Sequence, residues 1–404
     1  MVADKERSVI TSETEIEGGS IKASIDLNVD PVDQLHRRRS EKWTGHGPGV
    51  ISSTVAEMDF PLARPIVEVL RSAIERDDLG YTPGANPKLA EAFAHFAGRR
   101  LHWTVDPSQV RVVPDVMIGL LELARLLAGP GGSVAFSTPA YPPFLTEFPQ
   151  VRLLVDQIPL LPDGTTDLVA LGAAFATGTR VFILANPHNP TGRVLPRMEL
   201  EQIAELAVDH QAWVLADEIH APLTLPGAQH LPFLEVSDAA RDCGFALTSA
   251  SKAFNLAGLK AALIVTAGAA PRAIAARMLP MTDHTGLLGV LAAEAAFNGG
   301  DDWLDAVLHQ LDTNRGLLVT LLAERLPEVI WTPPEASYLA WLDCRRFGLG
   351  DNPAEQLSDR ARVALSSGPL YGPPGAGHAR LNFGTSPQLV EQMIDRVAGA
   401  IGEA

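Results

Sequence analysis

The chain has 404 residues, enough for two or three domains of ordinary size. Hydrophobic residues make up 46% of it and charged residues 20%, which excludes a disordered, collagen-like or coiled-coil protein. The net charge of −16 repels a phosphate backbone, and the one short basic run, 36–39, is soon followed by Glu41, so nucleic-acid binding is disfavoured.

Cysteine and histidine usage argues against a disulfide framework and against a metal site. Cys243 and Cys344 are the only two cysteines, and no histidine pair with metal-ligand spacing lies near a carboxylate. The N-terminus lacks an apolar signal core, and apolar runs such as 261–270 are shorter than a membrane helix requires. These features predict a soluble, cytoplasmic protein.

Residues 1–31 are polar and acidic without sustained periodicity, and we expect a flexible N-terminal tail there. From about residue 80 to 290, short apolar runs alternate with helical stretches such as 116–127 and 197–209. This alternation predicts an α/β domain with a mostly parallel sheet that helices cover on both faces. The runs predicted as its strands are 133–137, 151–155, 181–185, 212–216, 245–248 and 261–265.

The pattern changes after about residue 292. Long amphipathic stretches at 303–326 and 387–401 surround two predicted strands, 337–343 and 378–383. We therefore expect a smaller α+β domain beside the larger one. The predicted division is a tail at 1–31, an N-terminal segment of the small domain at 32–70, a large domain at 71–290 and the small C-terminal domain at 291–404.

Polar residues follow three successive predicted strands, at the edge where parallel sheets bind ligands. Asn189 lies in a rigid Asn-Pro turn after the third strand, Asp217 ends the fourth, and Lys252 follows the fifth among small hydroxyl residues. Taken singly, each residue has an ordinary structural explanation: a tight loop, a helix N-cap and an exposed loop lysine.

Together, these three side chains fit one cofactor, pyridoxal 5′-phosphate. Its aldehyde needs an amine, its ring nitrogen needs a carboxylate that keeps it protonated, and its phenolate oxygen needs a neutral donor. Its phosphate needs hydroxyl groups and free backbone N–H groups. The sequence therefore predicts a pyridoxal-phosphate enzyme.

The sequence resembles the aspartate aminotransferase superfamily, whose members are fold type I pyridoxal-phosphate enzymes, on the runs 186–192, 217–220, 249–252 and 380–384. Within it, the chain resembles the MalY/PatB branch of cystathionine β-lyases. The branch-specific runs are 39–43, 55–60, 80–82, 251–255 and 338–343. The likeness extends from about residue 32 to the C-terminus, and it implies an α/β/α sandwich with a smaller α+β domain.

The resemblance also implies a role for each matching residue. Lys252 would bind the cofactor covalently and, once substrate has displaced it, would act as the base that removes the α-proton. Asp217 would pair with the ring nitrogen, Asn189 with the phenolate oxygen, and Tyr141 would stack on the ring. Arg380 and Asn189 would bind the substrate, with Arg380 on the α-carboxylate, which suits the forked shape of a guanidinium group.

The phosphate contacts implied by the resemblance are Ser249, Ser251, Lys260 and the free backbone amides of Val116 and Met117. Tyr81 in this family reaches the phosphate of the neighbouring subunit, which implies a homodimer with shared active sites. His220 is expected beside the cofactor, although a packing role is an equal alternative for it, as it is for Trp43 and Tyr338.

Three departures from the family pattern affect these expectations. Lys260 stands where many members carry an arginine, so the charge remains but the bidentate geometry is lost. Asp115 stands where a small residue is usual, and we expect it to cap the helix and face away from the phosphate. Residues 377–379 and 384–386, beside Arg380, also differ from the branch, so substrate choice can differ.

The resemblance implies a carbon–sulfur β-lyase that converts cystathionine or another S-substituted cysteine to a thiol, pyruvate and ammonia. The alternative is an aminotransferase, or a specialised enzyme of secondary metabolism that acts on an S-conjugated amino acid. These reactions share the loss of the α-proton and differ in whether Cβ carries a leaving group. A regulator without turnover fits less well, because the N-terminal tail is too short and acidic for a DNA-binding domain.

Overall fold

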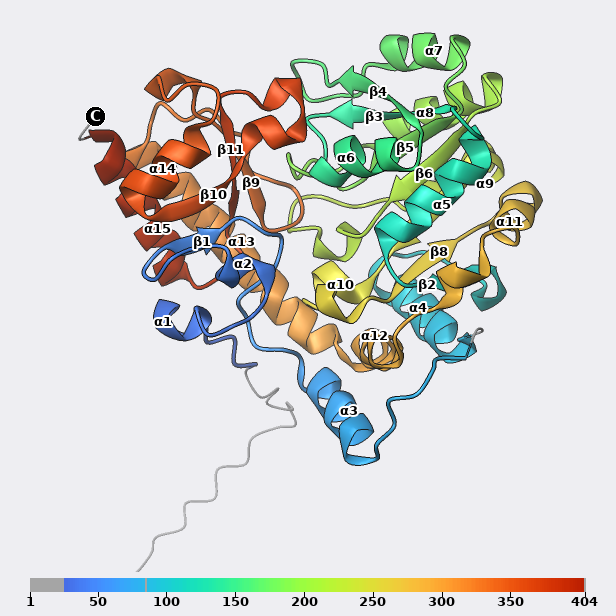
Figure 1. Ribbon diagram of the computed structural model, residues 1–404, viewed down its shortest axis with the longest axis horizontal. Helices are drawn as coiled ribbons and strands as arrows, with labels where there is room; N and C mark the ends of the chain where they lie inside the picture. Colours follow the sequence, from blue (N-terminus) through green and yellow to red (C-terminus); the bar gives the residue numbers. More distant parts are fainter. Residues whose placement is uncertain (1–24, 84–85, 403–404) are drawn as a thin grey trace, which may run out of the picture.

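The computed structural model describes residues 25–83 and 86–402 and contains two sheets, each with its own helices (Figure 1). The larger sheet has seven strands in the order β2-β8-β7-β6-β5-β3-β4. Strand β8 is antiparallel to both of its neighbours, and all other pairs are parallel. The strands are β2 (Val110–Val113), β3 (Ser133–Thr138), β4 (Leu154–Pro159), β5 (Val181–Ala185), β6 (Trp213–Asp217), β7 (Gly244–Thr248) and β8 (Ala262–Val265).

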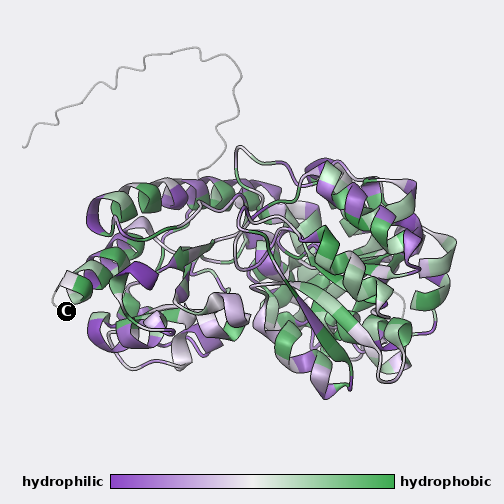
Figure 2. Cartoon of the chain, turned by 90° about the horizontal axis from the view of Figure 1, so that it is seen from above, coloured by the Kyte–Doolittle hydropathy of each residue, from purple (hydrophilic) through white to green (hydrophobic). Residues whose placement is uncertain are grey.

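Helices cover both faces of the larger sheet, and hydrophobic residues run along its strands (Figure 2). Successive strand residues enter two separate cores: Val134 and Phe136 pack with α5 and α6, whereas Ala135 packs with the helices of the opposite face. The predicted α/β architecture with a mostly parallel, doubly covered sheet is confirmed. Its helices are α4 (Pro87–Arg100), α5 (Val116–Ala128), α6 (Pro142–Gln150), α7 (Leu168–Ala176), α8 (Arg197–Asp209), α9 (Asp238–Cys243), α10 (Ala250–Ala253), α11 (Ala269–Ala275) and α12 (Leu287–Gly299).

The smaller sheet has four strands in the order β1-β10-β11-β9. Strand β1 comes from the N-terminal part of the chain and pairs in parallel with β10, so distant segments share this sheet. The strands are β1 (Ile51–Ser53), β9 (Leu339–Asp343), β10 (Val363–Ser367) and β11 (His378–Asn382). The remaining helices are α1 (Val32–Leu35), α2 (Glu41–Thr44), α3 (Arg64–Glu75), α13 (Asp301–Arg325), α14 (Pro353–Ala361) and α15 (Pro387–Gly402).

Most predicted strands of the larger sheet begin within one residue of their observed start. The exception is the strand predicted at 151–155, which begins at Leu154 because Val151 ends α6 and Arg152 turns the chain with φ +63°. Strands β1, β2 and β10 were not predicted.

The structure tests little of the predicted tail, since residues 1–24 lie outside the described part of the chain. The described part begins with an extended segment, 25–31, that leads into α1. Among the described helices, none combines the length and the apolar character needed to cross a membrane.

Candidate active site

One cavity of about 220 Å³ lies at the carboxyl ends of β5, β6 and β7. Parallel strands bring their carboxyl ends to one edge of the sheet, and the polar residues that follow them therefore meet there. The predicted site residues that line this cavity are Val116, Met117, Tyr141, Asn189, Asp217, His220, Ser249, Ser251, Lys252 and Lys260.

The loop after β5 presents Asn189. Gly192 turns this loop with φ +70°, and a Cβ atom there would lie 2.3 Å from the Cβ of Pro334, so only glycine allows the close approach. The Gly192 carbonyl accepts hydrogen bonds from the amides of Glu335 and Ala336, which attaches the loop to the segment that precedes β9. These contacts fix the position of the Asn189 amide at the cavity.

Asp217 ends β6 as a buried carboxylate, and within the described part of the chain its side chain has a single hydrogen-bond donor, the Ile219 amide at 3.1 Å from Oδ1. Burial raises the pKa of its carboxyl to about 7, although that amide and the charge of Lys252 oppose the shift. A buried carboxylate in this state is suited to a cationic ligand, because the ligand would supply the missing counter-charge.

His220, three residues further on, is buried at the same cavity. Its Nδ1 atom has no hydrogen-bond partner among the described residues, and its ring lies edge-on to Tyr338 with centroids 6.3 Å apart. Burial, with the charges of Lys252 and Arg380, lowers the pKa of His220 to about 3, so the ring is neutral.

Lys252 lies in the short helix α10, whose N-cap is Ser249. Its Nζ donates to the Ala56 carbonyl at 3.0 Å. Burial, together with the charge of Arg380, lowers the pKa of this amine to about 8, while nearby carboxylates oppose the change. A lysine with a lowered pKa is a better nucleophile and base at neutral pH than an exposed lysine.

The structure corrects two expectations at the predicted phosphate site. The Met117 amide is not free, because it donates to Asp115 Oδ1 at 2.8 Å, as expected of a helix N-cap. Asp115 does not face away from the cavity but lines it, and its Oδ2 accepts from Lys260 Nζ at 2.9 Å. The Ser249 hydroxyl also has protein partners, since it accepts from the Ser251 amide at 3.0 Å.

Arg380 extends from β11 toward Asn189 and is buried. Its Nη1 donates to Asn189 Oδ1 at 3.1 Å, and its Nη2 donates to the Thr54 carbonyl at 2.7 Å. The guanidinium carbon lies 5.2 Å from the ring centre of Tyr371, and Nε has no partner among the described residues. The side chain is therefore held in place with hydrogen-bonding capacity still unused.

Residues 55–57 line the cavity, and the segment 54–59 that contains them, here called the wall, has contacts that sequence reasoning did not predict. Tyr338 Oη donates to the Ala56 carbonyl at 2.8 Å, and Asn255 bonds both the amide and the carbonyl of Met58 at 2.8 Å. The side chain of Asn382 donates to the carbonyls that flank Ala56, those of residues 55 and 57, at 2.6 and 2.7 Å. The sequence signals for this wall were its own run, 55–60, and the runs 251–255, 338–343 and 380–384, which contain its three partners Asn255, Tyr338 and Asn382.

Tyr338 and Trp43 do not line the cavity directly. Tyr338 is fully buried behind residues 54–59, and Trp43 donates its indole N–H to Asp59 at 2.9 Å. The packing alternative therefore describes Trp43. Tyr81 lies apart from the cavity in the segment between α3 and α4, where its side chain is fully exposed.

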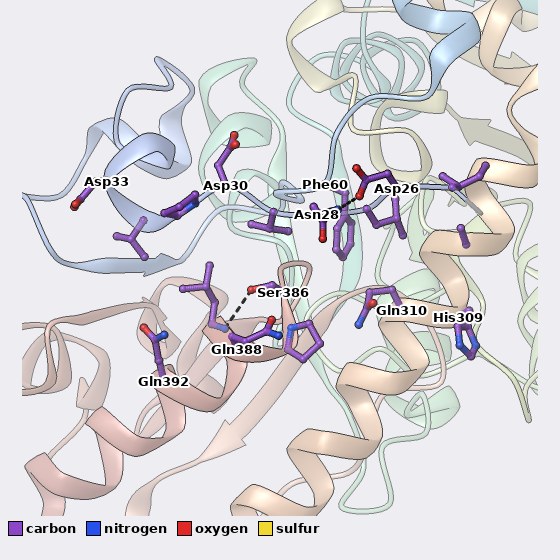
Figure 3. A pocket seen from close by; sticks show the side chains of 18 of the residues that line it. Asp26, Asn28, Asp30, Asp33, Phe60, His309, Gln310, Ser386, Gln388 and Gln392 are labelled. Atoms are coloured by element: carbon purple, nitrogen blue, oxygen red, sulfur yellow. Dashed lines mark hydrogen bonds between the residues drawn. The ribbon is translucent and has the colours of Figure 1, made fainter. Parts of the chain in front are cut away.

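A wider, more open hollow of about 1190 Å³ lies elsewhere, between residues 25–33 and the helices α13 and α15 (Figure 3). Asp26, Asp30, His309 and Gln392 project around it, and the predicted site residues are not among those that line it. The cavity at the carboxyl ends of the strands is therefore the candidate active site.

The residues of the cavity fit pyridoxal 5′-phosphate on the chemistry of their side chains. Lys252 supplies an amine with a lowered pKa, Asp217 a buried carboxylate that lacks a cation, and Asn189 a neutral amide. Lys260 supplies a positive charge where a phosphate would lie, although Asp115 competes for it. The fit is weaker at the phosphate end than at the ring.

Comparisons with known proteins identify the family of the chain. The profile of a family described as "Aminotransferase class I and II" matches residues 54–397. A relative from Mycobacterium tuberculosis is 42% identical over 400 residues, which cover 92% of this chain and 97% of the relative. "Cystathionine beta-lyase PatB" of Bacillus subtilis is 33% identical over 387 residues, 93% of this chain and 100% of PatB. The PLP-bound C-S lyase from Staphylococcus hominis superposes with a TM-score of 0.84 at 26% identity, over 93% of this chain and 99% of the lyase.

Proposed function

The chain belongs to the class I and II aminotransferase family, in its MalY/PatB branch, and we propose that it is a pyridoxal-phosphate-dependent carbon–sulfur β-lyase. The substrate is L-cystathionine or another S-substituted L-cysteine, and the products are a thiol, pyruvate and ammonia. The observation that carries this proposal is the single cavity at which Lys252, Asp217 and Asn189 meet, with Arg380 bonded to Asn189.

Four side chains would hold the cofactor ring in this proposal. Lys252 binds the aldehyde carbon, Asp217 pairs with the ring nitrogen, Asn189 donates to the phenolate oxygen, and Tyr141 packs on the ring face. The raised pKa of Asp217 supports its assignment, because a cationic ring nitrogen beside the buried carboxylate would restore its charge. When bound, pyridoxal phosphate supplies the electron sink that allows a proton to leave the α-carbon of an amino acid.

At the phosphate end, Ser249, Ser251, Lys260 and the Val116 amide remain the proposed contacts, and His220 is proposed beside the ring. The capping of Met117 by Asp115 leaves one fewer amide for an anion. Release of the Lys260 ammonium from Asp115 would free a cation for the phosphate.

Lys252 and Arg380 would then act on different groups of the amino-acid substrate. The Arg380 guanidinium binds the α-carboxylate, and its Nε, which has no protein partner among the described residues, can donate to that group. Lys252 Nζ accepts the α-proton, which its lowered pKa allows near neutral pH once the amine is uncharged. Loss of the sulfur substituent from Cβ then follows as a thiolate leaves.

Product analysis tests the proposal. The holoenzyme is given L-cystathionine without any keto-acid acceptor, while thiol, pyruvate and ammonia are measured. Continuous release of all three in equal amounts is expected of a β-lyase. A single stoichiometric burst of keto acid that resumes only on addition of an acceptor would identify an aminotransferase instead.

We also propose a homodimer in which Tyr81 reaches the neighbouring active site. The exposed Tyr81 side chain, with exposed Leu79, Ile74 and Met281, supports an apolar contact surface. A mixed dimer of the Tyr81→Ala and Lys252→Ala chains should recover activity, because one of its two sites would then have both residues. A mixture that stays inactive would contradict the shared site.

The cytoplasmic location and the division into domains remain proposals as well. The two free, buried cysteines, Cys243 and Cys344, suit a reducing compartment. Pairing of β1 with β10 supports the assignment of 32–70 to the same domain as 291–404, with 71–290 as the large domain.

A further inference from the structure

A buried tyrosine contacts the arginine that we assign to the substrate α-carboxylate. Tyr371 ends the short 3-10 helix Gly368–Tyr371, which follows β10, and its side chain is buried. The centre of its ring lies 5.2 Å from the guanidinium carbon of Arg380. Within residues 25–83 and 86–402 the Tyr371 hydroxyl forms no hydrogen bond, so the ring itself is what this side chain offers to its neighbours.

The contact with the ring differs in kind from the hydrogen bonds of Arg380. Nη1 donates to Asn189 Oδ1 at 3.1 Å, while Nη2 donates to the Thr54 carbonyl at 2.7 Å and to Ser366 Oγ at 3.3 Å. A substrate carboxylate would need some of these N–H groups, and it would displace their present acceptors. A cation–π contact uses none of the N–H donors, so the ring of Tyr371 can hold the guanidinium both before and after substrate binds.

Two further rings fix the position of Tyr371. Trp341 meets it edge-on, with centroids 5.1 Å apart and planes at 64°, and His378 stacks on Trp341 with centroids 5.2 Å apart and planes at 10°. Arg380 is paired with Trp341 in the register of β11 and β9, and His378 precedes Arg380 by two positions, so these three side chains share one face of the smaller sheet. His378 belongs to the run 377–379, at which the chain departs from the branch pattern.

Tyr371 also connects these rings to the larger sheet. Its carbonyl accepts from the Ala140 amide at 2.9 Å, and Ala140 directly precedes Tyr141, which lines the active-site cavity. The next residue, Gly372, turns the chain with φ +102°, and a Cβ atom there would lie 3.4 Å from Cγ2 of Thr138, at the end of β3. Tyr371 therefore contacts both the arginine assigned to the substrate and the segment that carries the aromatic residue assigned to the cofactor ring.

We propose that Tyr371 is the positioning residue for Arg380, and that its ring keeps the guanidinium directed at the substrate α-carboxylate while the N–H groups exchange their acceptors. The inference rests on the proposed function, because it takes Arg380 as the group that binds the carboxylate. Since the ring acts through its π-system and the hydroxyl has no partner among the described residues, phenylalanine should replace Tyr371, whereas leucine should not.

The test measures how strongly the pyridoxal-phosphate holoenzyme prefers L-alanine to L-alaninamide, in which a neutral amide replaces the carboxylate. Both affinities are determined by titration for wild type, Tyr371→Phe, Tyr371→Leu and Phe175→Leu. Phe175 is a buried aromatic residue of α7 that does not line the cavity, and its variant is the matched control. We expect the preference for L-alanine to fall about fivefold or more in Tyr371→Leu and to change less than about twofold in the other two variants.

Two further variants separate positioning from a general loss of structure, which would weaken both ligands equally. Trp341→Leu removes the edge-on support of the ring and should lower the same preference, which also tests the proposal if Tyr371→Leu does not fold. In an Arg380→Ala background, Tyr371→Leu should cause no further change in the preference.

A preference for L-alanine that survives in Tyr371→Leu and Trp341→Leu would overturn the positioning role, and so would an equal loss in Tyr371→Phe or Phe175→Leu. Thiol release from L-cystathionine is measured separately on the wild-type holoenzyme. Its absence would overturn the β-lyase function alone, because neither L-alanine nor L-alaninamide carries a leaving group.

Discussion

Replacement of Asp217 by asparagine should stabilise the cofactor-free protein at high pH while it weakens cofactor binding. Burial raises the pKa of the Asp217 carboxyl from 3.8 to about 7. In the folded protein the carboxyl therefore ionises near pH 7, whereas in the unfolded chain it ionises near pH 3.8. The free energy of unfolding of wild-type apoprotein falls as pH rises between these values and stays low above pH 7.

Proton linkage gives the size of this effect. Between pH 5 and pH 8, wild type should lose roughly 2–3 kcal/mol of unfolding free energy through Asp217 relative to a residue that does not titrate. Asparagine has nearly the same shape, and its Oδ1 can still accept from the Ile219 amide, which now lies 3.1 Å from the carboxylate. The advantage of Asp217→Asn over wild type should therefore grow by that amount with pH.

Urea denaturation of the two apoproteins at pH 5 and pH 8 measures this difference, with Glu205→Gln as an exposed control. Titration of each apoprotein with pyridoxal phosphate, followed by absorbance, should show at least about tenfold weaker binding to Asp217→Asn, because a charge-assisted hydrogen bond is lost. A stability difference that does not change with pH would refute the proposed desolvation of Asp217. Unchanged cofactor affinity would refute its pairing with the ring nitrogen.

Lys252→Ala should lose both the yellow colour of the covalently bound cofactor and essentially all turnover. A variant that stays yellow and active would contradict the assignment of Lys252 as the residue that binds the cofactor. Arg380→Ala should raise KM for S-substituted cysteines roughly tenfold or more while the cofactor stays bound, because a charged contact to the α-carboxylate is lost. Cofactor loss with an unchanged KM would instead place Arg380 at the cofactor. Asp59→Asn should lower the unfolding free energy by roughly 3–5 kcal/mol in urea, since it leaves the buried Lys42 ammonium, now 2.9 Å from the carboxylate, without its counter-charge. Glu68→Gln, which breaks an exposed ion pair, should cost less than about 1 kcal/mol, and similar losses in the two variants would contradict this difference in burial.

The sequence allowed prediction of the strand ends because each signal there is local. An apolar run of four or five residues with Asn-Pro, Asp-Glu or Ser-Lys at its end or within three residues of it identifies both the strand and the polar residues that follow it. Parallel pairing then brings Asn189, Asp217 and Lys252 to one edge, and no long-range contact has to be known in advance. The helix cap at Asp115 was also a local prediction.

The consequences of that cap were harder to predict. The oxygen atoms of Asp115 accept from the Met117 amide and from Lys260. The family resemblance had implied that both of these groups would bind the phosphate. Which way a capping carboxylate turns depends on the cation that packs beside it, and Lys260 is 145 residues away along the chain. Capping propensity alone does not contain that information.

The contacts of the wall at residues 54–59 could not be predicted either, because they too join residues that are far apart in the sequence. Its backbone is held by Asn255, Tyr338 and Asn382, which lie between 197 and 327 positions further along the chain. Asn255 follows α10, the short helix after strand β7 of the larger sheet, whereas Asn382 ends β11 of the smaller sheet. The position of Glu57 therefore depends on how the two sheets are placed against each other, and a pattern of strands and helices does not specify this.

The wall also contacts Lys252, the lysine to which we assign the proposed chemistry. The Ala56 carbonyl accepts from both Lys252 and Tyr338, so the Lys252 amine and the neighbouring Glu57 are attached to the same short piece of backbone. In the proposed reaction Lys252 would leave Ala56 to bind the cofactor, and Tyr338 would then be the donor that keeps this carbonyl satisfied. Burial keeps the Tyr338 hydroxyl protonated by raising its pKa, so this donor would remain while the lysine acts.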